Sequence, residues 1–551
     1  MPELNWVGKN KVINHHLDVP YRVLERQYSF DQAGQHEEDN GSENMIIHGD
    51  NLEALKALLP RYEGQVDVIY IDPPYNTGNE GWVYNDAVND PQIKKWLGEV
   101  VGKEGEDLSR HDKWLCMMYP RLRLLHRLLA PTGAIFISID DNEVFNLKQI
   151  CDEIFGSSCF VADIAVVNNW KGRSDSKYIA TAHEHLLFYR GKDFVSSGIP
   201  VPDEYVKDYK LQDQRGRYRL LGLRKRGANS RRQDRPNLFY AFAYNPKTGE
   251  LRVGNPVEAQ GEIAILPKLS DGSDGNWRWG KETAAQRLND LEAKLVKRRN
   301  EYDIFQKDYL DGDDEKRIKP KSVWQGSEFS AEAGTLELKA IMGSRSFDTP
   351  KPTALIKYCL EQMPSRDAVV LDSFAGSGTT AHAVLDFNNK DGGKRRFILV
   401  ELGDYSEEVT CERVRRVING YGRGEKYRQG TGGDFSFYEL GPQLMVDGNL
   451  NHVVPVDQVR DYIWFTETRL AVPDVSSVNP YYLGSANGAV YYFIYEPNSL
   501  TVLDHEFLAT MDANHRGDSY VIYADVCELS LEELAKLNIV FKKIPRDITR
   551  L

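Results

Sequence analysis

The segment 66–78 (VDVIYIDPPYNTG) constrains the fold of this chain more than any other stretch. Apart from Asp67, residues 66–71 are β-branched, aliphatic or aromatic, which is typical of a buried strand in an α/β sheet. Pro73 and Pro74 end the strand, because proline lacks an N–H group and has a fixed φ angle. The sequence therefore predicts a buried strand that delivers Asp72 to the edge of a sheet.

The end of this strand carries the groups of a small polar clamp. We expect the carboxylate of Asp72 and the carbonyls of Pro73 and Pro74 to face a ligand, with the ring of Tyr75 beside them. Two such acceptors can each take one N–H of the exocyclic amino group of adenine, which localises the nitrogen lone pair for attack on a methyl group. Stacking of a base on an aromatic ring contributes about 1–3 kcal/mol. These four residues are our predicted catalytic residues; the alternative is a plain strand-ending turn, where Asp and Pro are common.

A second strand and turn occur at residues 367–380 (DAVVLDSFAGSGTT). An apolar strand runs into a glycine-rich turn, and a helix is expected over residues 380–387. Gly376 and Gly378 allow close approach of a ligand to the backbone, and the helix N-terminus adds positive potential. A Walker-type phosphate loop needs Lys after its last glycine, whereas Thr379 follows Gly378. The turn is therefore predicted to cradle a nucleoside or phosphate, and ATP is disfavoured.

A carboxylate follows the glycine-rich turn at the sequence spacing that is typical of nucleotide-binding sites. Residues 396–400 form another apolar strand, which ends at Glu401. In α/β nucleotide sites, an acid about 20 residues after the glycine loop holds ribose hydroxyls. The two features together predict a cofactor that contains adenosine.

These motifs resemble those of a known family. The DPPY motif at 72–75 and the DSFAGSG motif at 372–378 look like the catalytic and S-adenosylmethionine motifs of the amino-methylating DNA methyltransferases. Their order, with the catalytic motif first, is similar to the β group, and the fit is closest to the modification (Mod) subunit of type III restriction-modification systems. Segments 4–9, 137–143 and 539–546 share the resemblance, which is weakest in the middle of the chain.

The resemblance implies an α/β, Rossmann-like methyltransferase fold: a doubly wound, mostly parallel sheet with circularly permuted motif order, an inserted target-recognition domain and a small C-terminal α/β domain. The implied cofactor is S-adenosyl-L-methionine, held by Asp372, Phe374, Ala375, Gly376, Gly378, Thr379, Glu401, Asp50 and Lys351. For Asp50 the alternative is a helix cap alone, ahead of the helix of Leu52, Leu55 and Leu59. For Lys351 it is the start of a helix beside proline.

The net charge of −13 argues at face value against a nucleic-acid partner, but the basic residues are grouped. Residues 215–235 hold nine basic side chains and one acid, and a local basic stripe is the usual footprint of nucleic-acid binding. The alternative is a solvated charged face. The predicted DNA-binding residues are Arg215, Arg217, Arg219, Arg224, Lys225, Arg226, Arg231, Arg232 and Arg235.

Composition and organisation narrow the function further. The 551 residues suit roughly three compact units. We expect an N-terminal arm (1–44, with a linker at 31–44), a catalytic half (45–190), a target-recognition insert (191–344), a cofactor-binding half (345–430) and a dimerisation or partner domain (431–551). No leader or long apolar segment is evident, so a cytoplasmic location is expected. None of the six cysteines follows proline, which disfavours methylation of a cytosine ring carbon.

Several local expectations can be tested directly. A loop over the site is expected at 76–108, a helix after a cap at Asp140 or Asp141, and a charged helix over 281–304. His183 and His185 share a strand face without an evident third ligand, so no metal site is expected.

The predicted activity is methylation of a flipped adenine in double-stranded DNA, by a homodimer that a restriction subunit can accompany. Asp at position 72 favours adenine over cytosine by resemblance. A cytosine-amino methyltransferase, an RNA methyltransferase and a non-catalytic DNA-recognition subunit are the alternatives.

Overall fold

The computed structural model describes residues 3–77, 105–172, 177–311, 315–473, 479–511 and 515–546, with the backbone alone at 105–109. The chain forms two compact units, one of residues 1–197 and 321–551 and the other of residues 198–320. In the described segments no helix is long and apolar enough to cross a membrane.

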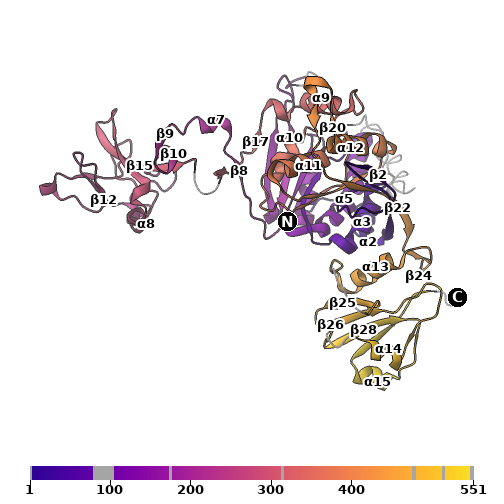
Figure 1. The fold of residues 1–551 in the computed structure, drawn as a ribbon. Helices are drawn as coiled ribbons and strands as arrows, with labels where there is room; N and C mark the ends of the chain where they lie inside the picture. The colour runs from indigo at the N-terminus through magenta and orange to yellow at the C-terminus, as the bar shows by residue number, and fades with distance from the viewer. Residues whose placement is uncertain are drawn as a thin grey trace. The chain divides into compact units, whose positions relative to one another are not determined.

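An eleven-stranded mixed sheet is the centre of the first unit (Figure 1). The six neighbouring strands from β5 to β22 run parallel, and antiparallel pairs flank them on both sides. In spatial order the strands are β17 (Val323–Trp324), β6 (Phe160–Val166), β7 (Glu184–Arg190), β5 (Leu129–Ile139), β4 (Val66–Ile71), β18 (Val369–Asp372), β19 (Arg396–Glu401), β3 (Met45–His48), β22 (Phe435–Gln443), β1 (Arg22–Asp31) and β2 (Gly34–His36).

Helices cover both faces of this sheet because alternate strand side chains point to opposite faces. Ile69 and Ile71 belong to one buried cluster and Val68 and Tyr70 to another, and all four are at most 1% exposed. The first cluster includes α3 (Asn51–Tyr62), α5 (Gly105–Leu128) and α6 (Val144–Cys151); the second includes α9 (Ala331–Met342), α10 (Thr353–Leu360), α11 (Thr379–Asp391) and α12 (Glu412–Asn419). The predicted doubly wound α/β fold is confirmed.

Strands β4 and β18 are neighbours, with Val68 paired to Val370, although 300 residues separate Asp72 from Asp372 in the sequence. From β4 the chain continues through α5 to β5 on one side, and from β18 through α11 to β19 on the other. Such a change of direction opens a crevice at the carboxyl ends of the two strands, where α/β proteins bind ligands. Both predicted motifs therefore lie at the carboxyl ends of neighbouring parallel strands, where such a crevice is expected.

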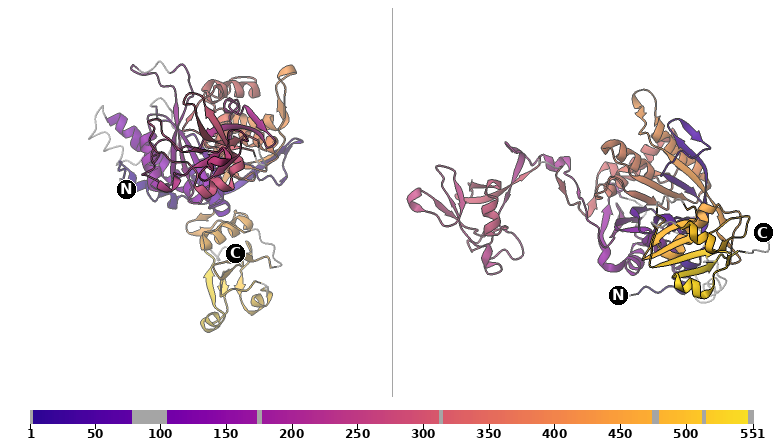
Figure 2. Two further views of the ribbon diagram at one scale, coloured as in Figure 1. Left: turned by 90° about the vertical axis from the view of Figure 1, so that its left-hand side faces the viewer. Right: turned by 60° about the horizontal axis from the view of Figure 1, so that its bottom comes forward.

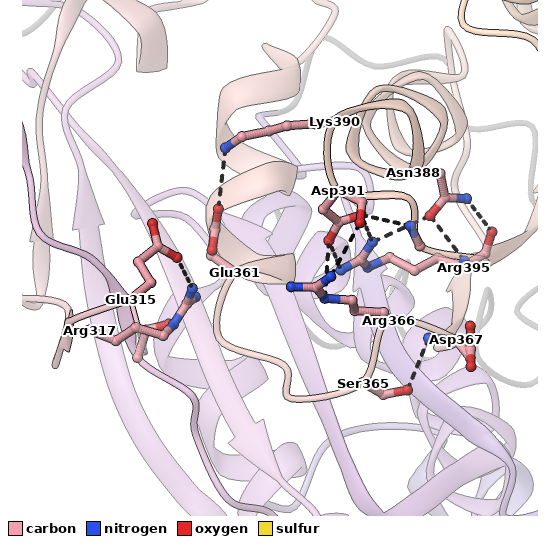
Figure 3. Close-up of polar contacts among 12 residues, drawn as sticks. Glu315, Arg317, Glu361, Ser365, Arg366, Asp367, Asn388, Lys390, Asp391 and Arg395 are labelled. Carbon is pink, nitrogen blue, oxygen red and sulfur yellow. Dashed lines mark hydrogen bonds and ion pairs between the residues drawn. The ribbon is translucent and has the colours of Figure 1, made fainter. Parts of the chain in front are cut away.

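The short connection between α11 and β19 is held by polar contacts (Figure 3). The Arg395 guanidinium donates to both carboxylate oxygens of Asp391 at 2.8 and 3.0 Å. The side chain of Asn388 exchanges hydrogen bonds of 3.0 and 2.7 Å with the Arg395 backbone. These contacts fix the start of β19, and thereby the strand that carries Glu401.

The second unit is built largely of short strands. One sheet has the order β14-β15-β10-β9 and another the order β12-β11-β13. Its elements are β8 (Ile199–Pro200), α7 (Asp203–Val206), β9 (Leu211–Asp213), β10 (Gly216–Gly222), β11 (Phe242–Tyr244), β12 (Leu251–Val253), β13 (Ile263–Ile265), α8 (Lys281–Gln286), β14 (Leu291–Val296), β15 (Glu301–Tyr309) and β16 (Arg317–Ile318). Trp277 and Phe242, both fully buried, lie in its core.

The predicted helix at 281–304 is wrong. Helix α8 ends at Gln286, and β14 then pairs antiparallel with β15. Leu291 is buried whereas Leu295 is 41% exposed, so these two leucines do not share one apolar face. Pairing with β15 outweighed the local helical pattern, as tertiary context often does.

The C-terminal part of the first unit forms a separate four-stranded sheet, yellow in Figures 1 and 2. Its strands are β25 (Tyr482–Ala486), β26 (Ala489–Phe493), β28 (Ser519–Ala524) and β30 (Ile539–Lys543), with α13 (Val456–Thr468), α14 (His505–Thr510) and α15 (Leu531–Lys536). Ser530 and Glu533 form a capping box at the start of α15.

Three local predictions need correction. Residues 22–31 and 34–36 form strands of the main sheet, so 1–44 is not a separate arm and 31–44 is not simply a linker; β22 likewise joins the sheet from beyond residue 430. Of the expected loop 76–108, residues 78–104 lie outside the described part, and 105–108 begin α5. Helix α6 has Glu143 as its N-cap, rather than Asp140 or Asp141.

Candidate active site

Asp72 lies at the carboxyl end of β4, as predicted, and faces a partly buried cation. Its Oδ1 atom lies 3.2 Å from Nζ of Lys351, an ion pair without the alignment of a hydrogen bond. Burial raises the pKa of the Asp72 carboxyl, and the charge of Lys351 partly opposes that effect. Lys351 was predicted at the cofactor pocket. It lies just before α10, whose N-cap is Pro352, and the structure places its ammonium group among the predicted catalytic residues.

Tyr75 is tied to the same cation. Its hydroxyl donates to Oε2 of Glu184 at 3.0 Å and accepts from Nζ of Lys351 at 2.5 Å. Lys351 also donates to Oε2 of Glu184 at 2.9 Å, and Asn168 donates to the same oxygen at 3.3 Å. Sequence reasoning missed Glu184, which is 5% exposed at the start of β7. The one sequence feature that could have indicated Glu184 is its place as an acid at the start of the apolar strand that includes residues 186–189.

The two proline carbonyls differ from each other. The indole Nε1 of Trp114, on α5, donates to the Pro74 carbonyl at 2.7 Å. The prediction that both carbonyls face a ligand is therefore wrong for Pro74. Within the described segments no hydrogen bond is donated to the Pro73 carbonyl, which remains available as the second acceptor of the clamp.

The glycine-rich loop after β18 has the conformation that only glycine adopts readily. Gly376 and Gly378 have φ angles of +51° and +77°. A Cβ at Gly378 would lie 3.2 Å from the Thr410 carbonyl oxygen, and one at Gly376 would lie 3.2 Å from the Phe347 ring. The buried Oγ of Ser373 has no hydrogen-bond partner among the described residues. A close cradle with an unused polar atom fits a bound nucleoside cofactor.

Glu401 closes this loop. Its carboxylate accepts from the backbone N–H of Gly376 at 2.7 Å, the N–H of Gly403 at 2.9 Å and the Tyr405 hydroxyl at 2.9 Å. Burial raises the pKa of Glu401, and these hydrogen bonds oppose the shift. The carboxylate that was predicted to hold ribose hydroxyls thus fixes the backbone of the glycine-rich loop.

Most of the remaining predicted cofactor residues are buried and hold the glycine-rich loop through hydrogen bonds or packing. Asp372 accepts from the Phe374 N–H at 3.1 Å and from the Thr380 hydroxyl at 2.5 Å, and burial raises the pKa of Asp372 to about 7. Thr379 donates its hydroxyl to the carbonyl of Lys351 at 3.2 Å, the residue whose ammonium group pairs with Asp72. Phe374 and Ala375 are buried at 7% and 5% exposure.

Asp50 is both a cap and a charge partner. Its carboxylate accepts from the Leu52 N–H at 2.7 Å, which caps α3, and from the buried Arg121 at 3.2 Å. The neighbouring Asn51 donates to the Ser373 carbonyl at 2.8 Å. The helix-cap interpretation of Asp50 is confirmed, and the contact of Asn51 places this helix start beside the glycine-rich loop.

The comparisons with known proteins agree with this geometry. Residues 66–411 match the N6_N4_Mtase family, described as DNA methylase. The chain belongs to this family.

Two relatives show how far the similarity extends. The type II methyltransferase M.KpnI of Klebsiella pneumoniae is 39% identical over 364 residues, which cover 66% of this chain and 81% of the relative. The type III EcoPI Mod subunit of Escherichia phage P1 is 34% identical over 414 residues, covering 72% and 63%. The chain thus spans less than two thirds of that Mod subunit. The solved M1.HpyAVI–SAM complex matches with a TM-score of 0.31 and 14% identity, covering 67% of this chain and 98% of that one.

In this DNA methylase the basic stripe divides into two parts. The strand part is neutralised by ion pairs: Arg215 with Asp290, Arg217 with Asp311, and Arg219 with Asp308, at 2.5 to 2.9 Å. In the following loop Arg232 pairs with Asp274 at 3.0 Å, and Arg224 donates to the Lys268 carbonyl. Within the described residues no ion pair is recorded for Lys225, Arg226, Arg231 and Arg235.

A third potential metal ligand lies beside the two histidines. Ligand atoms of Asp141, His183 and His185 lie within 4.8 Å of one another, so the structure brings to the two histidines a third group that was not evident in the sequence. His185 faces carboxylates on both ring nitrogens, Asp163 at 2.9 Å from Nδ1 and Asp141 at 3.1 Å from Nε2. These contacts raise the pKa of His185, and a protonated imidazole satisfies both carboxylates without a metal ion.

Proposed function

We propose that this DNA methylase transfers a methyl group to the exocyclic amino group of a flipped adenine in duplex DNA. The observation that carries the proposal is the adjacency of two strand ends: the Asp72 clamp on β4 lies beside the glycine-rich loop on β18. Flipping a base costs a few kcal/mol, which the pocket must recover.

The chain's own residues provide the amine site. The Asp72 carboxylate and the Pro73 carbonyl each accept one N–H of the amine, and Tyr75 contacts the base ring. The cofactor of the family, S-adenosylmethionine, supplies an electrophilic methyl group when bound. As the new N–C bond forms, one amine proton leaves, and Asp72 is positioned to accept it. Its pKa, raised by burial, makes it a better proton acceptor than an exposed aspartate.

The cofactor side is held by groups of the second motif. We propose that the loop at Gly376 and Gly378 approaches the nucleoside closely, that Glu401 binds the ribose hydroxyls, and that the unused Ser373 hydroxyl contacts the cofactor. The α11 N-terminus adds favourable potential. Asp372 and Thr379 keep the loop in place through the hydrogen bonds described above.

The choice of adenine rests on Asp72 and on the resemblance described above, while the family name covers N6 and N4 methylation alike. Transfer to the cytosine amino group is therefore the competing activity. The compact unit 198–320 is proposed to recognise the target, with Lys225, Arg226, Arg231 and Arg235 as phosphate contacts.

We further propose that the chain acts as a homodimeric Mod subunit that a restriction subunit can join, with the C-terminal sheet as the dimerisation or partner domain. Mod subunits of type III systems are among its relatives. A second candidate, a methyltransferase that acts without a nuclease partner, is favoured by the coverage of 81% of the type II relative. Mass measurement and strand-resolved methylation mapping separate them, because a type III Mod subunit is expected to modify one strand of an asymmetric site.

The first experiment measures transfer of labelled methyl from S-adenosylmethionine to DNA of varied sequence, followed by nucleoside analysis. Label in N6-methyladenine that disappears in Asp72→Ala supports the proposal. Label in N4-methylcytosine would show that the target is the amino group of cytosine and would contradict the choice of adenine. Absence of label with cofactor binding intact would contradict an autonomous activity.

A further inference from the structure

A single cation lies between two carboxylates at the candidate active site. Nζ of Lys351 lies 2.9 Å from Glu184 and 3.2 Å from Asp72, with the Tyr75 hydroxyl at 2.5 Å. The Lys351 side chain is 15% exposed and that of Glu184 7%. With both carboxylates ionised, this group carries one net negative charge.

The position of the cation conflicts with the proposed chemistry. Asp72 must accept an N–H from an uncharged amine, yet an ammonium group binds a carboxylate more strongly than a neutral donor does. An adenine amine therefore competes with Lys351 for Asp72. Removing the ammonium from Asp72 without another anion would leave a poorly solvated charge.

Glu184 supplies that other anion. Its Oε2 atom already accepts from Lys351, Tyr75 and Asn168, so the carboxylate is held in place from three sides. Its backbone is fixed in β7, which pairs with both β5 and β6. The ammonium group of Lys351 can thus leave the Asp72 carboxylate and remain ion-paired with Glu184.

We propose that Glu184 is a positioning residue that retains Lys351 and orients Tyr75 when an adenine amine takes the place of the ammonium group on Asp72. This inference rests on the proposed amino-methyltransferase function. Glu184 contacts no substrate in this scheme; it acts through Lys351 and Tyr75.

The charges predict how substitutions alter the pH dependence of methyl transfer, which requires an ionised Asp72. In the segments that the structure describes, the charged and titratable groups around Asp72 are Lys351, Glu184, Tyr75, Tyr70 and Asp372. Glu184→Gln removes a negative neighbour, so the acid limb of the rate profile moves to lower pH. Lys351→Met removes a positive neighbour, so the limb moves to higher pH.

The rates test the positioning role. In Glu184→Gln the ammonium keeps Asp72 as its one anionic partner among the described residues, and we expect the single-turnover rate at neutral pH to fall at least tenfold. In Glu184→Gln/Lys351→Met the ammonium that pairs with Asp72 in the described part of the chain is gone, and we expect at least a threefold recovery over Glu184→Gln. Asp163→Asn, on the neighbouring strand β6 and outside this cluster, is the matched control and should keep wild-type rates.

Calorimetry of S-adenosylmethionine binding shows whether each variant keeps an intact cofactor site. A Glu184→Gln enzyme that binds cofactor and matches the wild-type rate would overturn the inference. So would a double variant no faster than Glu184→Gln, or acid limbs that do not move in opposite directions. Failure of the proposed function is separate, because the wild-type enzyme would then methylate no amino group in DNA.

Discussion

Gly378→Ala tests whether the glycine-rich loop is a close-packed cradle. Gly378 is the N-cap of α11 and has a φ angle of +77°. An added Cβ would lie 3.2 Å from the Thr410 carbonyl oxygen. Thr410 cannot retreat freely, because its hydroxyl donates to the Gly376 carbonyl at 2.6 Å. Relief of the contact must therefore displace the loop itself.

Gly392→Ala is the matched control at the other end of α11. Gly392 is the C-cap, has a φ angle of +68°, and has nothing within 4 Å of an added Cβ. A left-handed conformation costs alanine about 1–2 kcal/mol, and the loss of unfolded-state freedom offsets roughly 0.4–1 kcal/mol of it. We expect the control to lose about 1 kcal/mol of unfolding free energy.

Gly378→Ala carries the same strain plus the contact with Thr410. Overpacking typically costs about 1–3 kcal/mol, so the total loss is expected to be roughly 2–4 kcal/mol. Because the displaced loop must return to hold the cofactor, S-adenosylmethionine should bind roughly tenfold or more weakly. The control should bind it as the wild type does. Urea unfolding and calorimetry measure both effects. Equal stability losses in the two variants, with unchanged cofactor affinity in both, would refute the reasoning.

Three further predictions concern charges elsewhere. Arg226→Gln should weaken DNA binding and reduce the slope of log affinity against log salt by about 1, whereas Arg217→Gln, which removes an already paired side chain, should change the slope less. His185→Asn should destabilise the protein at about pH 6 but little at about pH 9. The pKa of His185 is raised in the folded protein, so the stability that its protonated form contributes is lost as the pH rises above that pKa. A pH-independent loss of unfolding free energy in urea would contradict this. Arg546→Met should cost about 3–5 kcal/mol, since it leaves the fully buried Asp525 unpaired, and adding Asp525→Asn should recover part of that loss in unfolding assays.

Local patterns in the sequence predicted much of the catalytic core. The apolar runs before Asp72 and Glu401 correspond to β4 and β19 with the predicted ends. The pair Pro73–Pro74 stops the first strand, and the second stops just before Gly403. The positive φ angles of Gly376 and Gly378 likewise agree with the predicted tight turn. These features depend on neighbouring residues alone.

Other predictions failed where distant segments compete for the same backbone. A helix was expected at 281–304, but residues 291–296 form β14, which pairs with β15. The acidic stretch after residue 30 was expected to be a linker, but it contains β2, which pairs with β1 in the main sheet. The Pro74 carbonyl was expected to face a ligand, but it accepts a hydrogen bond from Trp114 on α5. No local pattern encodes such partners.

The sequence by itself determined which groups the site can offer: a carboxylate beside two prolines and a tyrosine, and a glycine loop followed by an acid. The tertiary structure decided how those groups are charged and oriented. Parallel pairing of β4 with β18 brings Asp72 to the glycine-rich loop, and the antiparallel strand β7 brings Glu184 to Lys351. Electrostatic interactions depend on distance and burial, and both arise only when segments hundreds of residues apart pack together.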